Sequence, residues 1–62
     1  MILQKYTVNA DRATGNWIGE AYETGEIVDG LAWLRQSDTH NKYFDTWERD
    51  GVTVAVEVTL VD

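Results

Sequence analysis

The chain has 62 residues, with 11 acidic side chains against five basic ones and a net charge of −6. A chain this short forms one domain, residues 1–62, and buries only about 60% of its unfolded surface, so its core must be small. The absence of cysteine excludes disulfide bonds and cysteine-ligated zinc sites. The acidic balance disfavours direct binding to DNA, RNA or anionic membranes, because their phosphates carry the same sign. It favours a partner protein with a basic surface, or it only keeps the protein soluble.

The N-terminal residues, MILQKYTV, have neither the cationic start of a signal peptide nor an apolar run long enough to cross a membrane. This pattern and the lack of cysteine lead us to expect a cytoplasmic protein, located in the host cytoplasm if a phage encodes it.

Two strands are predicted in the first part of the chain, over residues 2–9 and 17–23. The residues between them are typical of a turn. Asp11 can accept hydrogen bonds from the following backbone N–H groups, and Gly15 can adopt a left-handed conformation.

The register of this first hairpin is open. Val8 faces Ile18 in one register and Gly19 after a slip of one residue. Because neighbouring side chains alternate between the two faces of a strand, the slip also decides whether Trp17 is buried.

A helix is predicted over residues 25–37, with Thr24 as its N-cap and with Glu26 and Asp29 in or near the first turn. Its apolar stripe follows the helical period and consists of Ile27, Val28, Leu31, Ala32 and Leu34. Gly30 in the middle costs about 1 kcal/mol relative to alanine. This glycine predicts either close packing against a strand or a weak helix.

The strongest structural signal is a hairpin over residues 43–61, centred on Asp50-Gly51. Asp-Gly suits a two-residue type I′ turn, which needs positive φ at both central positions. The turn predicts the opposite pairs Arg49–Val52, Trp47–Val54, Asp45–Val56 and Tyr43–Val58. Asp45 then shares a face with the valines, which is consistent only if it lies near a sheet edge or beside a cation.

The predicted order is β-β-α-β-β, and the fold class is α+β. The simplest arrangement is a two-layer fold in which one helix packs on one face of a four-stranded antiparallel sheet. We expect the helix to cover the face with the valines, Trp47 and Tyr43. The other face, with Phe44, would then be exposed or shared with a second chain.

No catalytic, cofactor or metal site is predicted. His40, the single histidine, lies two residues from Asp38, but no third partner or pocket is visible. Ser37 lacks a nucleophile-elbow motif, the glycines form no phosphate-binding loop, and the acids do not match a calcium-loop spacing. We therefore expect a non-enzymatic protein without a cofactor.

Four acids recur at every third position from the second predicted strand into the predicted helix: Glu20, Glu23, Glu26 and Asp29. Negative charges spaced on a small rigid fold can imitate DNA phosphates and occupy a nucleic-acid-binding groove on another protein. The alternative interpretation is an ordinary solvated acidic surface.

Trp33 is the most specific candidate for a binding residue. On the predicted helix it lies about 160° from the centre of the apolar stripe, near Glu26 and Asp29. An exposed tryptophan among acids resembles a binding hot spot. The alternative is that the helix has a different phase and Trp33 lies in the core. Phe44 adds a second apolar point on the outer sheet face, which Trp17 joins in one of the two registers.

From these features we expect a small acidic binding protein that acts as an inhibitor or adaptor on a basic surface of a larger protein. The candidate partner-binding residues are Trp33, Glu26, Asp29, Glu23, Glu20 and Phe44. In size and charge the chain resembles phage-encoded inhibitors of host nucleic-acid-processing or defence complexes, such as anti-CRISPR proteins, a resemblance of class that rests on no motif. The alternative function is a structural module whose outer sheet face forms a homodimer.

Overall fold

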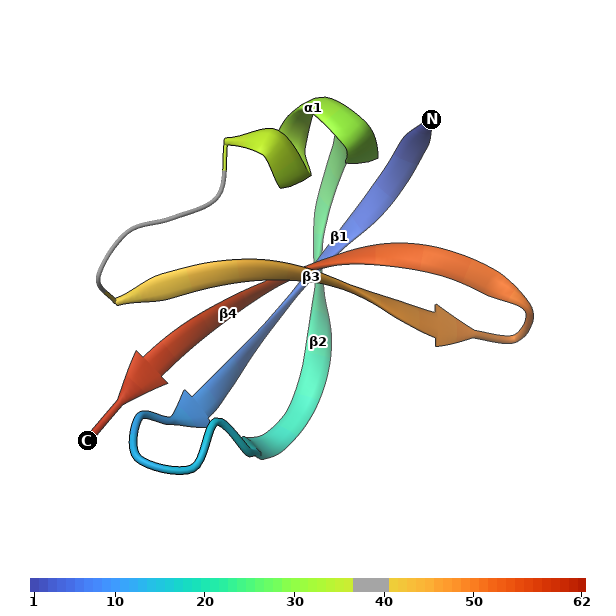
Figure 1. Cartoon of the computed structure of the whole chain (residues 1–62). Helices are drawn as coiled ribbons and strands as arrows, with labels where there is room; N and C mark the ends of the chain where they lie inside the picture. Colours follow the sequence, from blue (N-terminus) through green and yellow to red (C-terminus); the bar gives the residue numbers. More distant parts are fainter. Residues whose placement is uncertain (37–40) are drawn as a thin grey trace.

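The computed structural model describes residues 1–36 and 41–62 as four strands and one short helix (Figure 1). The elements follow the predicted order: β1 (Ile2–Asp11), β2 (Trp17–Asp29), α1 (Gly30–Arg35), β3 (Lys42–Arg49) and β4 (Val52–Val61). The strands form one sheet in the order β2-β1-β4-β3. The predicted α+β class, with a four-stranded sheet and one helix, is confirmed.

The sheet is mixed, whereas the sequence predicted an antiparallel one. β1/β2 and β3/β4 are antiparallel pairs, but the central strands β1 and β4 run parallel. The reason is the connection over residues 30–41, which leads from one edge strand to the other, so that β3 begins beside the end of β4. A crossover of about a dozen residues permits a parallel arrangement. The two termini consequently lie at opposite ends of the sheet (Figure 1).

The β3/β4 hairpin is confirmed in every predicted pair. Its register runs without interruption over Lys42–Arg49. Asp50 and Gly51 both have positive φ, 52° and 76°, as a type I′ turn requires. Local patterning and turn chemistry therefore determine this half of the fold.

The turn of the β1/β2 hairpin is also confirmed. Asp11 Oδ1 accepts hydrogen bonds from the backbone N–H groups of Ala13 at 2.8 Å and Thr14 at 3.1 Å. Gly15 has a φ of 76°. The side chain of Asp11 thus closes the loop as its position in the sequence predicted.

The register beside this turn is the slipped one, with Asn9 opposite Ile18. It then shifts twice along β1, and at each shift β2 contains residues that have no partner in β1. Gly19 and Gly25, with φ of 82° and 79°, lie at these two bulges. The bulges let β2 continue along the full length of β1.

The helix begins later than predicted. Residues 25–29 belong to β2, where Ile27 and Val28 pair with β1. β-Branched side chains suit a paired strand, and here strand pairing prevails over the helical spacing of the apolar residues. The N-cap of the helix is Asp29 rather than Thr24. The predicted helix end at Ser37 and the loop with Asp38 and His40 lie outside the described residues.

The core lies on one face of the sheet, named here the valine face. It consists of side chains from the two central strands: Tyr6, Val8, Ala10, Val54, Val56 and Val58. Trp17 of β2 contacts Trp47 of β3 across this face, with ring centroids 6.2 Å apart. β2 and β3 are the two edges of the sheet, so the sheet curls, in the sense of its natural twist, until its edges cover its own core.

The helix packs on the opposite face, named here the helix face, and the prediction that it covers the valines is wrong. Gly30 lies so close to β1 that an added Cβ would stand 2.8 Å from Leu3 Cγ. Trp33 packs against Phe44, with ring centroids 4.0 Å apart. Phe44 pairs with Glu57 and therefore points away from the valine face. The curled sheet and its tryptophans already occupy the valine face, so the helix covers Leu3 and Phe44 instead.

Candidate partner-binding surface on the edge strand

The edge strand β2 carries all four of the regularly spaced acids. Its sequence, WIGEAYETGEIVD, contains no lysine or arginine, and all four carboxylates are exposed. The same strand contributes large apolar side chains that remain exposed: Trp17, Ile18, Tyr22 and Ile27. This surface, Trp17–Asp29, is named the acidic edge. It combines negative charge with apolar contact area.

Two of the acids have partners within the sheet. Glu23 accepts a hydrogen bond from the side-chain amide of Gln4, and Glu26 forms an ion pair with Lys5. Glu20 forms no ion pair with any described residue and lies beside a groove. Glu20 is therefore the acid of this edge with the greatest freedom to contact a partner.

A row of alternating charges crosses the helix face, with one residue from each strand. Lys5 Nζ lies 3.0 Å from Glu26 and 3.5 Å from Glu57, and Lys42 Nζ lies 3.6 Å from Glu57. Burial disfavours the charged form of Lys5. The hydrogen bonds and charges of Glu26 and Glu57 outweigh this burial and raise the pKa of Lys5 above its ordinary value. The row ties β2 to the centre of the sheet.

Asp29 has a structural role at the start of α1. Its Oδ1 accepts the backbone N–H groups of Leu31 and Ala32, each at 3.1 Å. The hydrogen bond from Ala32, followed by the positive charge of the chain's amino terminus, lowers the pKa of Asp29 below its ordinary value. Its carboxylate is thus used within the chain, although it lies at the end of the acidic edge.

Trp33 and Phe44 are brought together, but not in the arrangement that the sequence predicted. Both are half-buried and pack against each other on the helix face. The helix starts after Glu26 and Asp29, so neither acid lies in its first turn beside an exposed Trp33. Partner binding by these residues stays a prediction.

A groove separates the acidic edge from β3 on the valine face. It has a volume of about 460 Å³ and is lined by Trp17, Gly19, Glu20, Ala21, Trp47 and Arg49. The guanidinium of Arg49 lies 5.8 Å from the ring centre of Tyr6 and 5.9 Å from that of Trp47. Its Nη1 also donates a hydrogen bond to the Tyr6 hydroxyl at 3.2 Å. The groove thus has aromatic walls, one carboxylate and one guanidinium.

Sequence reasoning missed this groove. The pattern placed Trp47 and Arg49 on the valine face, since they alternate along one strand. It could not place Trp17 there, because the register of the first hairpin was open. The bulge at Gly19, which brings Glu20 beside Trp17, has only the glycine itself as a signal.

The other edge strand, β3, is of a different kind. Asp45 is exposed at this edge, as predicted for an acid among the valines, and its Oδ1 accepts the backbone N–H of Thr46 at 2.8 Å. A side chain that occupies an edge N–H group protects the edge from pairing with another strand. β3 also carries both Lys42 and Arg49, so of the two edge strands only β2 has acids without a cation.

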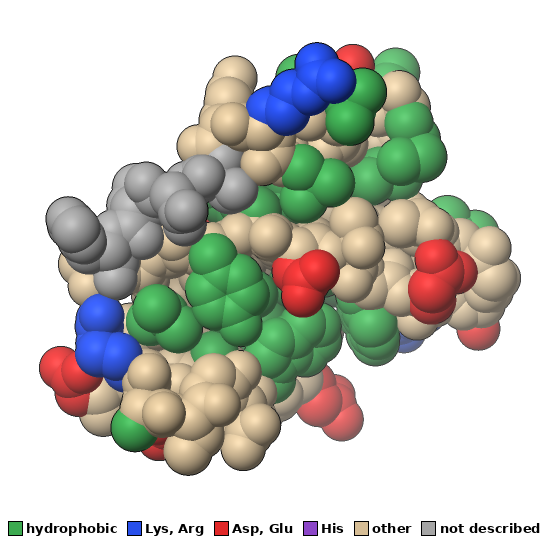
Figure 2. Space-filling model, in the orientation of Figure 1, with side chains coloured by type: hydrophobic (Ala, Val, Ile, Leu, Met, Phe, Trp, Pro, Cys, Tyr) green, Lys and Arg blue, Asp and Glu red, His purple; other side chains and the backbone are tan. Residues whose placement is uncertain are grey.

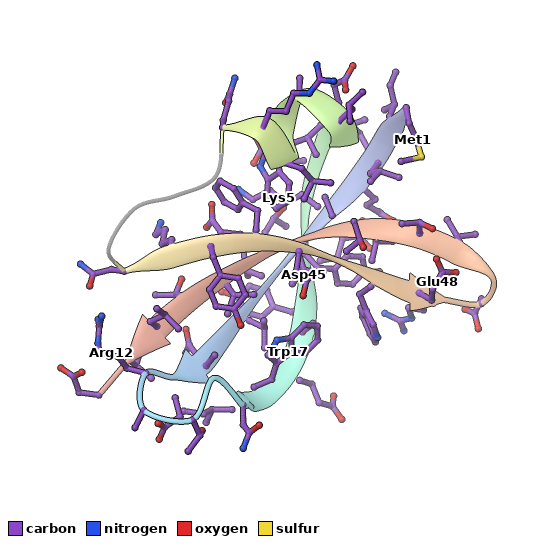
Figure 3. The ribbon with its side chains drawn as sticks, in the orientation of Figure 1. Met1, Lys5, Arg12, Trp17, Asp45 and Glu48 are labelled. Atoms are coloured by element: carbon purple, nitrogen blue, oxygen red, sulfur yellow. The ribbon has the colours of Figure 1, made fainter. Side chains whose placement is uncertain are left out.

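Figure 2 shows hydrophobic side chains gathered below the helix and across the middle of the visible face, with acidic groups dispersed around them. The cation Arg12 lies away from the acidic edge, at the end of β1, where its Nε is 2.8 Å from Asp62 (Figure 3). Arg12 thus does not neutralise the acidic edge, and β2 contains no arginine or lysine of its own.

Comparisons with protein-family models, curated proteins and solved structures found no match for this chain. Within residues 1–36 and 41–62, no helix has the length and apolarity needed to cross a membrane. In the same ranges, no group of three His, Asp or Glu side chains is arranged to hold a metal ion.

Proposed function

We propose that this chain is a small non-enzymatic binding protein that docks its acidic edge on a basic surface of a larger protein, as an inhibitor or adaptor. The observation that carries the proposal is the composition of β2. Four exposed acids and several exposed apolar side chains lie on one edge strand that contains no cation. Opposite charge on a partner would speed encounter, and the apolar side chains would supply contact area. A cytoplasmic location is part of the proposal and is compatible with the absence of cysteine.

One form of this function is DNA mimicry, in which the acidic edge occupies a groove that normally binds nucleic acid. Its acids follow one extended strand, as phosphates follow a backbone, and the net charge of −6 disfavours binding of the chain to nucleic acid itself. In this form, double-stranded DNA should compete with the chain for its partner, and the competition should weaken as salt is added.

The test compares two triple variants that remove the same charge from the two edge strands. Glu20→Gln/Glu23→Gln/Glu26→Gln removes three of the four carboxylates of the acidic edge, and Asp45→Asn/Glu48→Gln/Asp50→Asn removes the two carboxylates of β3 and that of the adjoining turn. A partner is captured from lysate with the wild-type chain, identified by mass spectrometry, purified and titrated against all three proteins.

The β2 variant should lose at least about tenfold in affinity, because three favourable charges act on one contact surface. The β3 variant should lose less than about threefold through the change in net charge alone. Equal losses would show that only net charge matters, and no loss in either variant would overturn the proposal. Circular dichroism confirms that both variants fold.

A homodimer formed through the outer sheet face is less well supported. Phe44 packs against Trp33 on the helix face, whereas Trp17 packs against Trp47 on the valine face. The two aromatic residues expected to form one interface are therefore on opposite sides of the sheet. Light scattering tests this alternative, which requires a stable dimer at micromolar concentration.

A further inference from the structure

The groove beside the acidic edge suggests what chemistry on the partner this protein recognises. It is formed because β2 bulges at Gly19 while its two ends remain paired with β1. Apart from Gly19 and its two chain neighbours, no atom of the described residues lies within 4 Å of the position that a Cβ of Gly19 would occupy. Its volume of about 460 Å³ falls within the range of pockets that bind small molecules and is large enough for one side chain.

Three features make the groove attractive for a cation. Trp17 lines the groove and is 36% exposed, and the face of an indole ring carries the negative end of the ring quadrupole. The carboxylate of Glu20, which forms no ion pair with any described residue, lines the same groove. The net charge of −6 also favours the approach of a positive group.

Arg49 supplies an internal example of the same recognition. Its guanidinium lies over the rings of Tyr6 and Trp47 at 5.8 Å and 5.9 Å, in one wall of the groove. The aromatic cluster of the valine face thus already binds one guanidinium by ring contact. Among the described residues, no such cation lies over Trp17.

We propose that the groove receives an arginine side chain of the partner protein, with its guanidinium on the ring of Trp17 and against the carboxylate of Glu20. Arginine fits better than lysine, because a planar guanidinium stacks on an aromatic ring and still offers a fork of donors to a carboxylate. The inference rests on the proposed function and names the group that anchors the partner's basic surface.

Arg49 repels an incoming cation, so substitutions of Glu20 and Arg49 should have different effects on the binding of a cation. If the groove holds arginine, removing the charge of Glu20 weakens binding and removing the charge of Arg49 does not. If the groove instead holds a carboxylate, the two substitutions have the opposite effects.

The experiment follows the indole N–H signals of ¹⁵N-labelled protein by NMR while short capped peptides are added. The peptides are Gly-Arg-Gly, Gly-citrulline-Gly and Gly-Glu-Gly, where citrulline has the shape of arginine without its charge. Trp17→Phe assigns the Trp17 signal and keeps an aromatic ring in the groove. The isolated protein suffices, so the result does not depend on a partner.

The Arg peptide should shift the Trp17 and Trp47 signals at millimolar concentration, and the citrulline peptide should bind at least about threefold more weakly. Glu20→Gln should weaken binding of the Arg peptide about two- to fivefold. Asp50→Asn is the matched control, because it removes the same charge from a turn outside this groove and asparagine suits the positive φ there. It should leave binding unchanged within about 1.5-fold at moderate salt, and Arg49→Gln should leave it unchanged or strengthen it.

Several outcomes would overturn the inference: no shift of either indole signal, equal binding of the citrulline peptide, equal effects of Glu20→Gln and Asp50→Asn, or binding of the Glu peptide that Arg49→Gln abolishes. Any of these can occur while the β2 triple variant still loses its partner. Failure of the groove is therefore distinguishable from failure of the acidic edge as a whole.

Discussion

On the valine face, Val56 and Val58 are fully buried although α1 does not cover them. On the helix face, α1 covers Leu3 and Phe44, and Thr7 lies beside the row of charges that includes Glu57. The first face is closed by the curl of the sheet and the contact between its edge strands. The second face is closed by a separate element of six residues. In so short a chain the sheet itself can therefore bury most of the core, while the helix covers only a few side chains of the opposite face.

Val56→Ala should have the largest effect, because it removes two methyl groups from the fully buried valine face. We expect the free energy of unfolding to fall by about 2–3 kcal/mol, a large part of the stability of a domain this small. Val52→Ala is the matched control on the same strand, since Val52 is 60% exposed. Its cost should stay below about 0.5 kcal/mol in urea unfolding. Similar losses would mean that the valine face is not the main core.

Gly30→Ala tests how closely the helix covers the other face. In an open helix this change stabilises by about 1 kcal/mol. Here the new Cβ would collide with Leu3, which is 5% exposed and has little room to move. We expect a net loss of about 1–2 kcal/mol on thermal unfolding. Leu3→Val in the Gly30→Ala background should recover part of the loss, and a stabilising Gly30→Ala would contradict the close contact.

Thr7→Val tests the part of the helix face that α1 does not cover. The Thr7 hydroxyl is buried and has no hydrogen-bond partner among the described residues. Replacing it with a methyl group of the same shape should stabilise the fold by about 0.5–1 kcal/mol. Thr53→Val is the matched control, because the Thr53 hydroxyl donates to Glu48, and its loss should cost about 0.5–1 kcal/mol. Chemical denaturation measures both changes, and two changes of the same sign would refute the contrast.

Asp29→Ser should have the smallest effect and should show itself mainly in acid. Serine preserves an N-cap oxygen but cannot ionise. The pKa of Asp29 is lower in the folded chain than its ordinary value of 3.8, so its carboxylate stabilises the fold above that pH and the contribution is lost as the pH falls further. The wild type should therefore lose more stability than Asp29→Ser below about pH 4. Parallel melting curves from pH 5 to pH 2.5 would show that the capping charge has no effect.

The acidic edge was only partly predictable from the sequence. The spacing of the acids from Glu20 to Asp29 was visible at once, but their placement along one edge strand was not. The helical spacing of the apolar residues placed Glu26 and Asp29 in or near a predicted first turn, with Trp33 close to them on the helix surface. In the structure, β1 is long enough to pair with residues that had a helical pattern, so the acids stay on β2 and Trp33 packs on Phe44.

Local sequence patterning specifies the element order and the β3/β4 hairpin, because period-two alternation and the Asp50-Gly51 turn act over short distances. The turn that Asp11 closes is specified in the same way. Three features instead depend on contacts between distant segments: the parallel pairing of β1 and β4, the bulge of β2 at Gly19, and the placement of the helix on the face opposite the valines. The residue pattern of one strand or helix does not specify which distant element packs against it. The groove between Trp17 and Trp47 is lined by residues of both edge strands, so its formation also depends on the tertiary structure.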